Sequence, residues 1–317
     1  MTGGGFGKAL AALVATALAL APGGAAARPP AGRAAPAQAS AQADAMRHAR
    51  PALWLLKDED TRIYLFGTIH ALPGGIEWNQ GAVAEALAAA DELVLESDVA
   101  STSFGDLLGG LMTMMAVGQP PILERVQPGL RPRLRDAIEA SLMPMSIYDR
   151  MKTWAVVMSL ADSRLEELGI ESDNGVERGL TAAWTRRGRR VMGLESAADQ
   201  SVFLDGIPEA TQRRWLEAVL AEEDDAEERG DFDEALLAWA RGDVEAIARL
   251  DADDPNDLPE IDDVLLRQRN ARWVEWLRSR LERPGVVFFA VGAAHLTGEH
   301  SLQTMLAGRG LRAERLQ

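Results

Sequence analysis

The amino-acid sequence predicts an α/β fold, and three observations support this prediction. Two apolar runs rich in branched and aromatic residues, 62–70 and 286–295, each end in the pattern Gly-x-x-His. Two further strand-like runs, 92–96 and 190–194, lie between them. Much of the remaining chain shows the apolar spacing of helices. Strands that alternate with helical segments are typical of a sheet covered by helices.

The two Gly-x-x-His segments predict where a functional site forms. Each apolar run indicates a buried strand, and the glycine after it allows the backbone to turn sharply as it leaves the sheet. His70 and His295 then lie just past two strand ends. Because pockets in α/β sheets form outside the carboxyl ends of strands, two strands of one sheet would bring both imidazoles to a common cleft.

The other predicted elements follow from the same patterns. Residues 52–56 and 63–66 predict a β-hairpin, residues 82–90 a helix, and residues 101–189 and 211–263 mainly helices. A long helix is predicted over residues 261–282, and one stripe at helical spacing contains Leu266, Asn270, Trp273 and Leu277. This stripe turns the polar Asn270 inward with its neighbour Arg269. These two polar side chains serve either an active site or, in the simpler interpretation, local backbone capping.

The N-terminus predicts export. Lys8 precedes an apolar stretch over residues 9–21 and then a region of small residues, the layout of a cleaved secretory signal. We therefore expect a signal peptide over residues 1–27, a flexible linker over 28–50 and a folded domain over 51–317, in the periplasm or secreted. An uncleaved anchor is the alternative. The chain has no cysteine, which excludes thiolate ligands and a lipid-modified N-terminal cysteine, so no stable membrane anchor is expected after cleavage.

The charge restricts the possible partners. The net charge of -15 comes from 48 acidic and 33 basic residues, whereas binding to a phosphate backbone requires clustered basic residues. Nucleic acid is therefore excluded as an expected partner, and a peptide or a small molecule is the expected substrate. The sequence does not indicate an oligomeric state.

Two glutamates complete the candidate site. Glu96 and Glu195 stand at the carboxyl ends of their predicted strands, as His70 and His295 do. Two imidazoles and two carboxylates suit a divalent ion such as Mn, Co, Zn or Fe. Such an ion activates a bound water, and one carboxylate can act as general base. Taken singly, each histidine has the alternative of a structural hydrogen-bonding role, and each glutamate that of a charge at a helix N-terminus.

A set of short motifs, in this order along the chain, resembles the TraB/GumN family, which includes the Tiki metalloproteases. The motifs are Leu53-Trp54, the segment 64–70, Leu93-Val94-Leu95-Glu96, Gly193-Leu194-Glu195 with Gln200, Arg269-Asn270, and the segment 291–296 with Gly298. The resemblance covers residues 52–316.

The resemblance implies a central mixed sheet with flanking helices, related to the erythromycin esterase and ChaN-like haem-binding folds, and a helical insertion at about residues 101–189. It implies that the Gly-x-x-His motifs and glutamates form the site, which in Tiki proteins is a metal-dependent peptidase centre. Arg269, Asn270 and Glu177 would support the ligands, although Glu177 stands where the family pattern has aspartate.

These observations lead to one principal hypothesis and two alternatives. The principal hypothesis is an exported, metal-dependent hydrolase with peptidase-like chemistry. The first alternative is a non-catalytic protein that binds haem or metal through the same histidines. The second is a metal-free, esterase-like hydrolase in which a Glu-His pair activates water directly.

Overall fold

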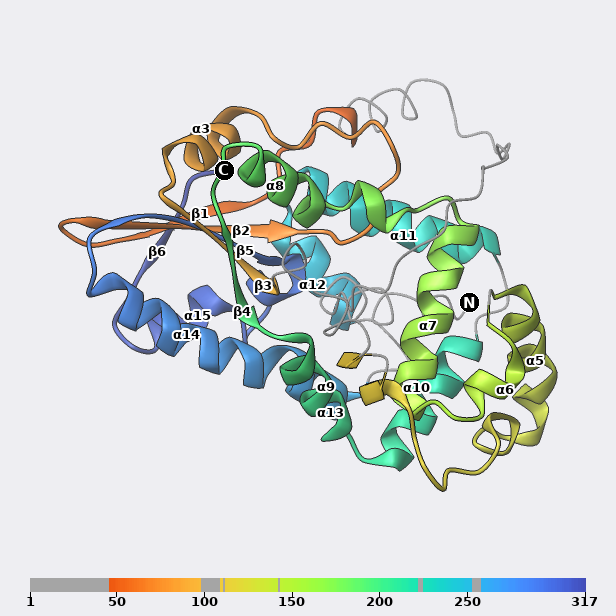
Figure 1. Ribbon diagram of the computed structural model, residues 1–317. Helices are drawn as coiled ribbons and strands as arrows, with labels where there is room; N and C mark the ends of the chain where they lie inside the picture. The colour runs from red at the N-terminus through yellow and green to blue at the C-terminus, as the bar shows by residue number, and fades with distance from the viewer. Residues whose placement is uncertain (1–45, 98–108, 111, 142, 222–224, 253–257) are drawn as a thin grey trace.

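A computed structural model describes residues 46–97, 109–110, 112–141, 143–221, 225–252 and 258–317. The predicted signal peptide and most of the predicted linker lie outside the described residues. The last linker residues, 46–50, pack on the domain, and Ala49 is fully buried. The sheet lies on one side of the molecule and a group of helices on the other (Figure 1).

A six-stranded mixed sheet forms the centre of the domain, in the order β4-β3-β5-β2-β1-β6. The neighbouring strands β4, β3, β5 and β2 are parallel, whereas β1 is antiparallel to both β2 and β6. The strands are β1 (Leu53–Lys57), β2 (Thr61–Thr68), β3 (Glu92–Ser97), β4 (Val191–Glu195), β5 (Gly285–Gly292) and β6 (Ala313–Arg315). The prediction of an α/β fold is thus confirmed, as is the hairpin formed by β1 and β2.

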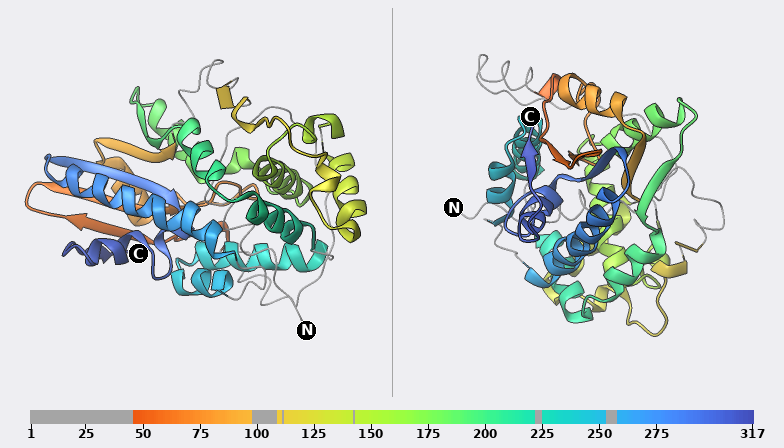
Figure 2. Two further views of the ribbon diagram at one scale, coloured as in Figure 1. Left: turned by 90° about the horizontal axis from the view of Figure 1, so that it is seen from below. Right: turned by 90° about the vertical axis from the view of Figure 1, so that its left-hand side faces the viewer.

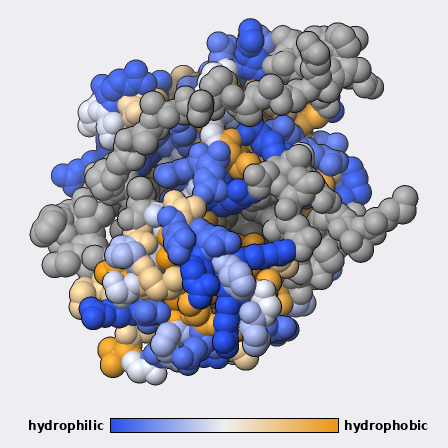
Figure 3. All heavy atoms as spheres, turned by 90° about the vertical axis from the view of Figure 1, so that its right-hand side faces the viewer, coloured by the Kyte–Doolittle hydropathy of each residue, from blue (hydrophilic) through white to orange (hydrophobic). Residues whose placement is uncertain are grey.

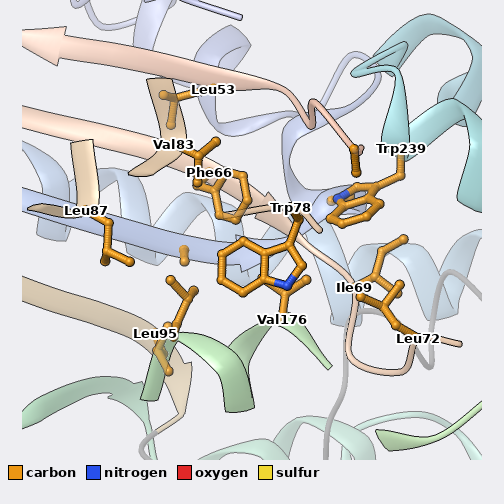
Figure 4. Close-up of a cluster of buried hydrophobic side chains, with 14 of the residues drawn as sticks. Leu53, Phe66, Ile69, Leu72, Trp78, Val83, Leu87, Leu95, Val176 and Trp239 are labelled. Atoms are coloured by element: carbon orange, nitrogen blue, oxygen red, sulfur yellow. The ribbon is translucent and has the colours of Figure 1, made fainter. Parts of the chain in front are cut away.

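Helices cover both faces of the sheet (Figures 1 and 2). One face packs against α3 (Gly81–Ala89), α8 (Val176–Thr185) and α11 (Asp225–Ala240), and the other against α14 (Gln268–Leu281) and α15 (Leu302–Ala307). Successive side chains along each strand point to opposite faces of the sheet. In β2, for example, Phe66 faces the first helical layer and Leu65 the second. Figure 4 shows Phe66 beside Trp78, with Trp239 of α11 and Val176 of α8 near by.

A separate group of helices lies beyond the carboxyl ends of the parallel strands and has its own apolar core. Trp154 and Leu216 are fully buried there, and Met151 and Met158 fill contacts between helices, as unbranched methionine commonly does. Figure 3 shows hydrophilic side chains on this side of the molecule, with apolar ones exposed between them. The elements of this group are α5 (Arg131–Ala140), α6 (Met145–Tyr148), α7 (Thr153–Glu167), α9 (Ala197–Asp205) and α10 (Glu209–Ala221), with 3-10 turns at Ile122–Glu124 and Pro128–Leu130. By contrast, α12 (Val244–Ala252) packs beside the sheet, against α11 and the 3-10 turn Ala293–Leu296 that follows β5. A further 3-10 turn spans Ser172–Asn174.

The predicted long helix over residues 261–282 is present but contains a change of helix type. It consists of α13 (Pro259–Asp262), a π-helical segment (Asp263–Arg267) and α14. The wider π turn shifts the inward stripe, so that Leu265 rather than Leu266 is buried. Arg269 and Asn270 begin the next turn and are both 1% exposed, which confirms that they face inward. Among the described residues, no helix is long and apolar enough to span a membrane.

Candidate functional site

The candidate site lies at the carboxyl ends of the four parallel strands. Residues Thr68 and Gly292 are register partners on β2 and β5, as Ser97 and Glu195 are on β3 and β4. His70 and His295 follow β2 and β5 within three residues, and Glu96 is the second-last residue of β3. The sheet therefore delivers all four predicted side chains to one edge, because parallel strands end on the same side.

Arg269 lies between the two glutamates. Its Nη2 atom is 2.6 Å from Glu96 Oε2 and 2.9 Å from Glu195 Oε2, and its Nε atom donates to both oxygens of Glu195. Nη1 donates to the carbonyl oxygen of Leu265, in the π turn. The guanidinium also lies over the ring of Trp273, 4.7 Å from its centroid. All three nitrogens of Arg269 therefore have acceptors, which fixes the side chain in place.

The contacts of His295 define its tautomer. Its Nε2 atom is 3.3 Å from Nη1 of Arg269, and its Nδ1 atom is 2.7 Å from Oδ1 of Asn270. Arginine only donates hydrogen bonds, so Nε2 must accept and Nδ1 must carry the proton. The Asn270 amide nitrogen donates to the backbone oxygens of His295 and His300, which leaves its Oδ1 to accept from Nδ1. His295 is therefore neutral.

Burial and nearby charges have opposite effects on the titrating groups of this cluster. Burial lowers the pKa of His295 well below 6.5, and the positive charges of Arg269 and His70 add to this effect. Burial raises the pKa of Glu96 above its ordinary value, although Arg269, His70 and the backbone N–H of Gly292 each lower it. The Gly292 nitrogen donates to Glu96 Oε1 over 2.6 Å.

His70 belongs to a second group of contacts. Its Nδ1 atom lies 2.7 Å from Glu177 Oε1, and the side chains of the two residues are 10% and 13% exposed. Thr68 donates its hydroxyl to the same Glu177 oxygen. Both ring nitrogens of His70 are buried, and neither has a hydrogen bond of regular geometry among the described residues; Nδ1 has its close ionic contact with Glu177, whereas Nε2 has none. A buried nitrogen without a partner is uncommon and requires an explanation.

The pair of His70 and Glu177 is mutually stabilising when charged. Burial lowers the pKa of His70, but the charge of Glu177 and its hydrogen bond outweigh this effect, so that the pKa lies above 6.5. Burial raises the pKa of Glu177, but His70 and Thr68 outweigh it and hold the pKa below its ordinary value. Glu177 therefore stays ionised and keeps Nδ1 protonated.

Close backbone packing holds these turns together. Val176, the first residue of α8, donates its backbone N–H to the carbonyl oxygen of Ile69 over 2.9 Å. A Cβ atom on the preceding Gly175 would lie 2.0 Å from the carbonyl oxygen of His70, so only glycine fits there. This contact brings Glu177, in the first turn of α8, to the imidazole of His70.

The structure thus gathers the predicted residues into two groups. Glu96, Glu195, His295, Arg269 and Asn270 form one connected cluster, and His70 contacts Glu177 instead of the other predicted ligands.

Three contributors were missed from the sequence. Trp273 donates to Glu195 Oε1 over 3.1 Å, and the half-exposed Arg272 lies 3.6 Å from the same oxygen. Thr68 is the third, through its bond to Glu177. Trp273 did lie on the predicted inward stripe of the long helix, which was the one available signal.

The four predicted ligands do not fit a metal centre in this arrangement. Three of them are already engaged, because Arg269 donates to Glu96, Glu195 and the Nε2 atom of His295. The fourth, His70, contacts Glu177 instead. Among the described residues, no three histidine or carboxylate side chains are placed to hold a metal ion. A bound Mn, Co, Zn or Fe ion stays a prediction from the sequence.

Comparison with known proteins assigns the chain to a class. The family model described as "TraB/PrgY/gumN family" matches residues 52–315. This match covers most of the chain and includes every strand and every residue of the site. The chain belongs to the TraB/PrgY/gumN family, as its motifs predicted.

Two relatives match over almost their whole length. Both are named uncharacterized protein YbaP, one from Escherichia coli strain K12 and one from Shigella flexneri, and each is 25% identical over 264 residues. The alignments cover 81% of this chain and 92% of each relative. No solved structure gives a significant match. The expected relation to the erythromycin esterase and ChaN-like folds therefore stays a prediction.

Proposed function

We propose that this chain is a hydrolase in which His70, oriented by Glu177, activates a water molecule. The observation that carries this proposal is the state of the imidazole: Nδ1 lies 2.7 Å from a carboxylate, while Nε2 has no hydrogen-bond partner among the described residues. Above the raised pKa of His70 the imidazole is neutral, and a carboxylate on Nδ1 then selects the tautomer in which Nε2 has a free lone pair. That arrangement defines a histidine general base.

The proposed reaction needs only the groups of this chain, a water and a carbonyl substrate. Nε2 of His70 takes one proton from water as the oxygen forms its bond to the carbonyl carbon. Glu177 stabilises the imidazolium that forms. The same proton then passes from Nε2 to the leaving group as its bond to the carbonyl carbon breaks. The imidazole returns to its neutral state, so the reaction leaves the charge of the site unchanged.

Of the three functions considered from the sequence, the metal-free hydrolase accounts best for the contacts. A metal-dependent peptidase would need Glu96, Glu195 and His295 as ligands, but their atoms accept hydrogen bonds from Arg269. Metal dependence is therefore an outcome for the assay to decide. The expected substrate is a peptide or a small molecule, and the N-terminal pattern of residues 1–27 supports export to the periplasm or the medium.

The assay measures hydrolysis of a peptide library and a panel of small esters by the purified full chain, before and after exhaustive chelation. We expect activity to survive chelation. We expect His70→Ala to lower kcat/KM by about 100-fold or more, the usual effect of a general base.

A matched control separates this effect from a general loss of histidine. His48 has a half-exposed side chain and lies outside both groups of site contacts, so His48→Ala should leave activity unchanged. Full activity in His70→Ala would overturn the proposal. Complete loss on chelation, restored by one divalent ion, would favour the metal-dependent alternative.

A further inference from the structure

The Arg269 guanidinium lies where the sequence predicted a metal ion. It is 1% exposed, and it contacts Glu96, Glu195 and His295 at once, with nitrogen-to-acceptor distances of 2.6, 2.9 and 3.3 Å. These three side chains come from the ends of β3, β4 and β5, so the sheet directs them toward one point. A positive charge at that point is what two buried carboxylates require.

Arginine and a metal ion would compete for the same atoms. A metal takes the lone pair of a neutral imidazole, and here the lone pair of His295 Nε2 accepts from Arg269 Nη1. Glu96 Oε2 and both oxygens of Glu195 likewise accept hydrogen bonds from Arg269 with the lone pairs that a metal would take. Rotation of one of these side chains would free its own atoms alone, because the guanidinium also binds the other two.

One pair of ligand atoms nevertheless has the spacing of metal ligands. His295 Nε2 and Glu96 Oε1 are 3.5 Å apart. Two ligands at about 2.1 Å from one tetrahedral ion lie about 3.4 Å apart, so the pair has the separation of neighbouring zinc ligands. The carboxylates of Glu96 and Glu195 both reach a single atom, Arg269 Nη2, as they would reach one ion.

We propose that Arg269 is the resident cation of this cluster, and that Glu96, Glu195 and His295 form a divalent-cation site only when the guanidinium is removed. In the wild-type protein, arginine supplies the charge that an ion would otherwise supply. Without it, two buried carboxylates and a neutral imidazole share one space and need a cation. This inference does not depend on the chain being a hydrolase.

The test measures binding of Mn²⁺ and of Zn²⁺ to the full chain by calorimetry and elemental analysis, after removal of metal by chelation. We expect the wild type to bind no more tightly than Glu195→Gln, which has lost one ligand. We expect Arg269→Ala to bind about one ion at least tenfold more tightly than wild type, and we expect the double variant Arg269→Ala with Glu195→Gln to lose that gain.

Two results would overturn the proposal. One is a wild-type protein that holds an ion which Glu195→Gln or His295→Gln releases. The other is a folded Arg269→Ala that binds no more tightly than wild type. Should Arg269→Ala fail to fold, the comparison of wild type with Glu195→Gln decides the question, since a resident arginine predicts equal affinity. Because the readout is metal binding, it is independent of whether His70 catalyses hydrolysis.

Discussion

Protonation of His295 is predicted to destabilise the fold at mildly acidic pH. The imidazole is fully buried and its Nε2 atom accepts from Arg269, which has no acceptor to offer in return. A second proton on the ring would place an N–H group against a guanidinium. The other groups that face it are Asn270 on Nδ1, Glu96 at 3.5 Å and the ring of Trp273. The pKa of His295 therefore lies well below 6.5 in the folded state.

The sign and size of the effect follow from linkage. Unfolded His295 takes up its proton near 6.5 and the folded state does not, so stability is full above that pH and falls as the pH drops below it. For a folded pKa far below the window, the loss between about pH 7.5 and about pH 5.5 is about 1.4 kcal/mol.

Two other site groups oppose this trend. His70 has a raised pKa in the folded state, so its contribution to the free energy of unfolding grows as the pH falls toward 6.5 and is constant below that pH. Burial raises the pKa of Glu96, so Glu96 gains stability as the pH falls through its folded pKa. The effect of His295 must therefore be isolated by comparison with a variant that lacks only that titration.

The assay is urea unfolding of the wild type and of His295→Gln at both pH values, followed by tryptophan fluorescence. His295→Gln should be the less stable protein at the higher pH. The wild type should lose about 1.4 kcal/mol more than the variant on acidification. If both proteins lose the same stability, His295 is not held neutral by its surroundings, and the deduced tautomer is wrong.

Three further predictions concern the other contacts of the site. Gly175→Ala should lower stability by about 2 kcal/mol or more in thermal unfolding, because its Cβ atom would meet the His70 carbonyl oxygen, whereas Gly230→Ala, in open space on α11, should be neutral or stabilising. Glu177→Gln should move the acid limb of kcat/KM to lower pH, because it removes the charge that raises the pKa of His70; an unmoved limb in a folded variant would contradict the pairing. Trp239→Phe removes an indole N–H that donates to a backbone oxygen at the end of β2, and should cost about 1–2 kcal/mol in urea unfolding, with an unchanged midpoint as the contrary result.

Local patterns in the sequence were sufficient to predict the strands and the edge of the sheet at which the site forms. The runs before Gly67 and Gly292 are continuous and apolar because both faces of β2 and β5 are covered by helices. Glu96 and Glu195 stood out because a charge directly after such a run marks a strand end. The inward position of Asn270 followed from helical periodicity, even though a π turn shifted the stripe before it.

The chemistry of the site required the tertiary structure. Arg269 and Glu177 were known as candidates for supporting roles, but the sequence carries no information on which acid each would contact. The pairing of Glu177 with His70 depends on how α8 begins against the end of β2, and the contacts of Arg269 depend on where the start of α14 lies beside the strand ends. The contact of Glu177 with His70 and those of Arg269 with the two glutamates join residues more than 70 positions apart and are set by packing.

The sequence by itself determined the family, the sheet and the identity of the polar residues at its edge, because these depend on periodicity and on short motifs. Only the tertiary structure decided that an arginine lies among the predicted ligands and that one of the two histidines has a free nitrogen. The physical reason is that differences of a few tenths of an ångström in distance decide which groups form hydrogen bonds. The packing of helices on the sheet sets these distances, and no local sequence pattern encodes them.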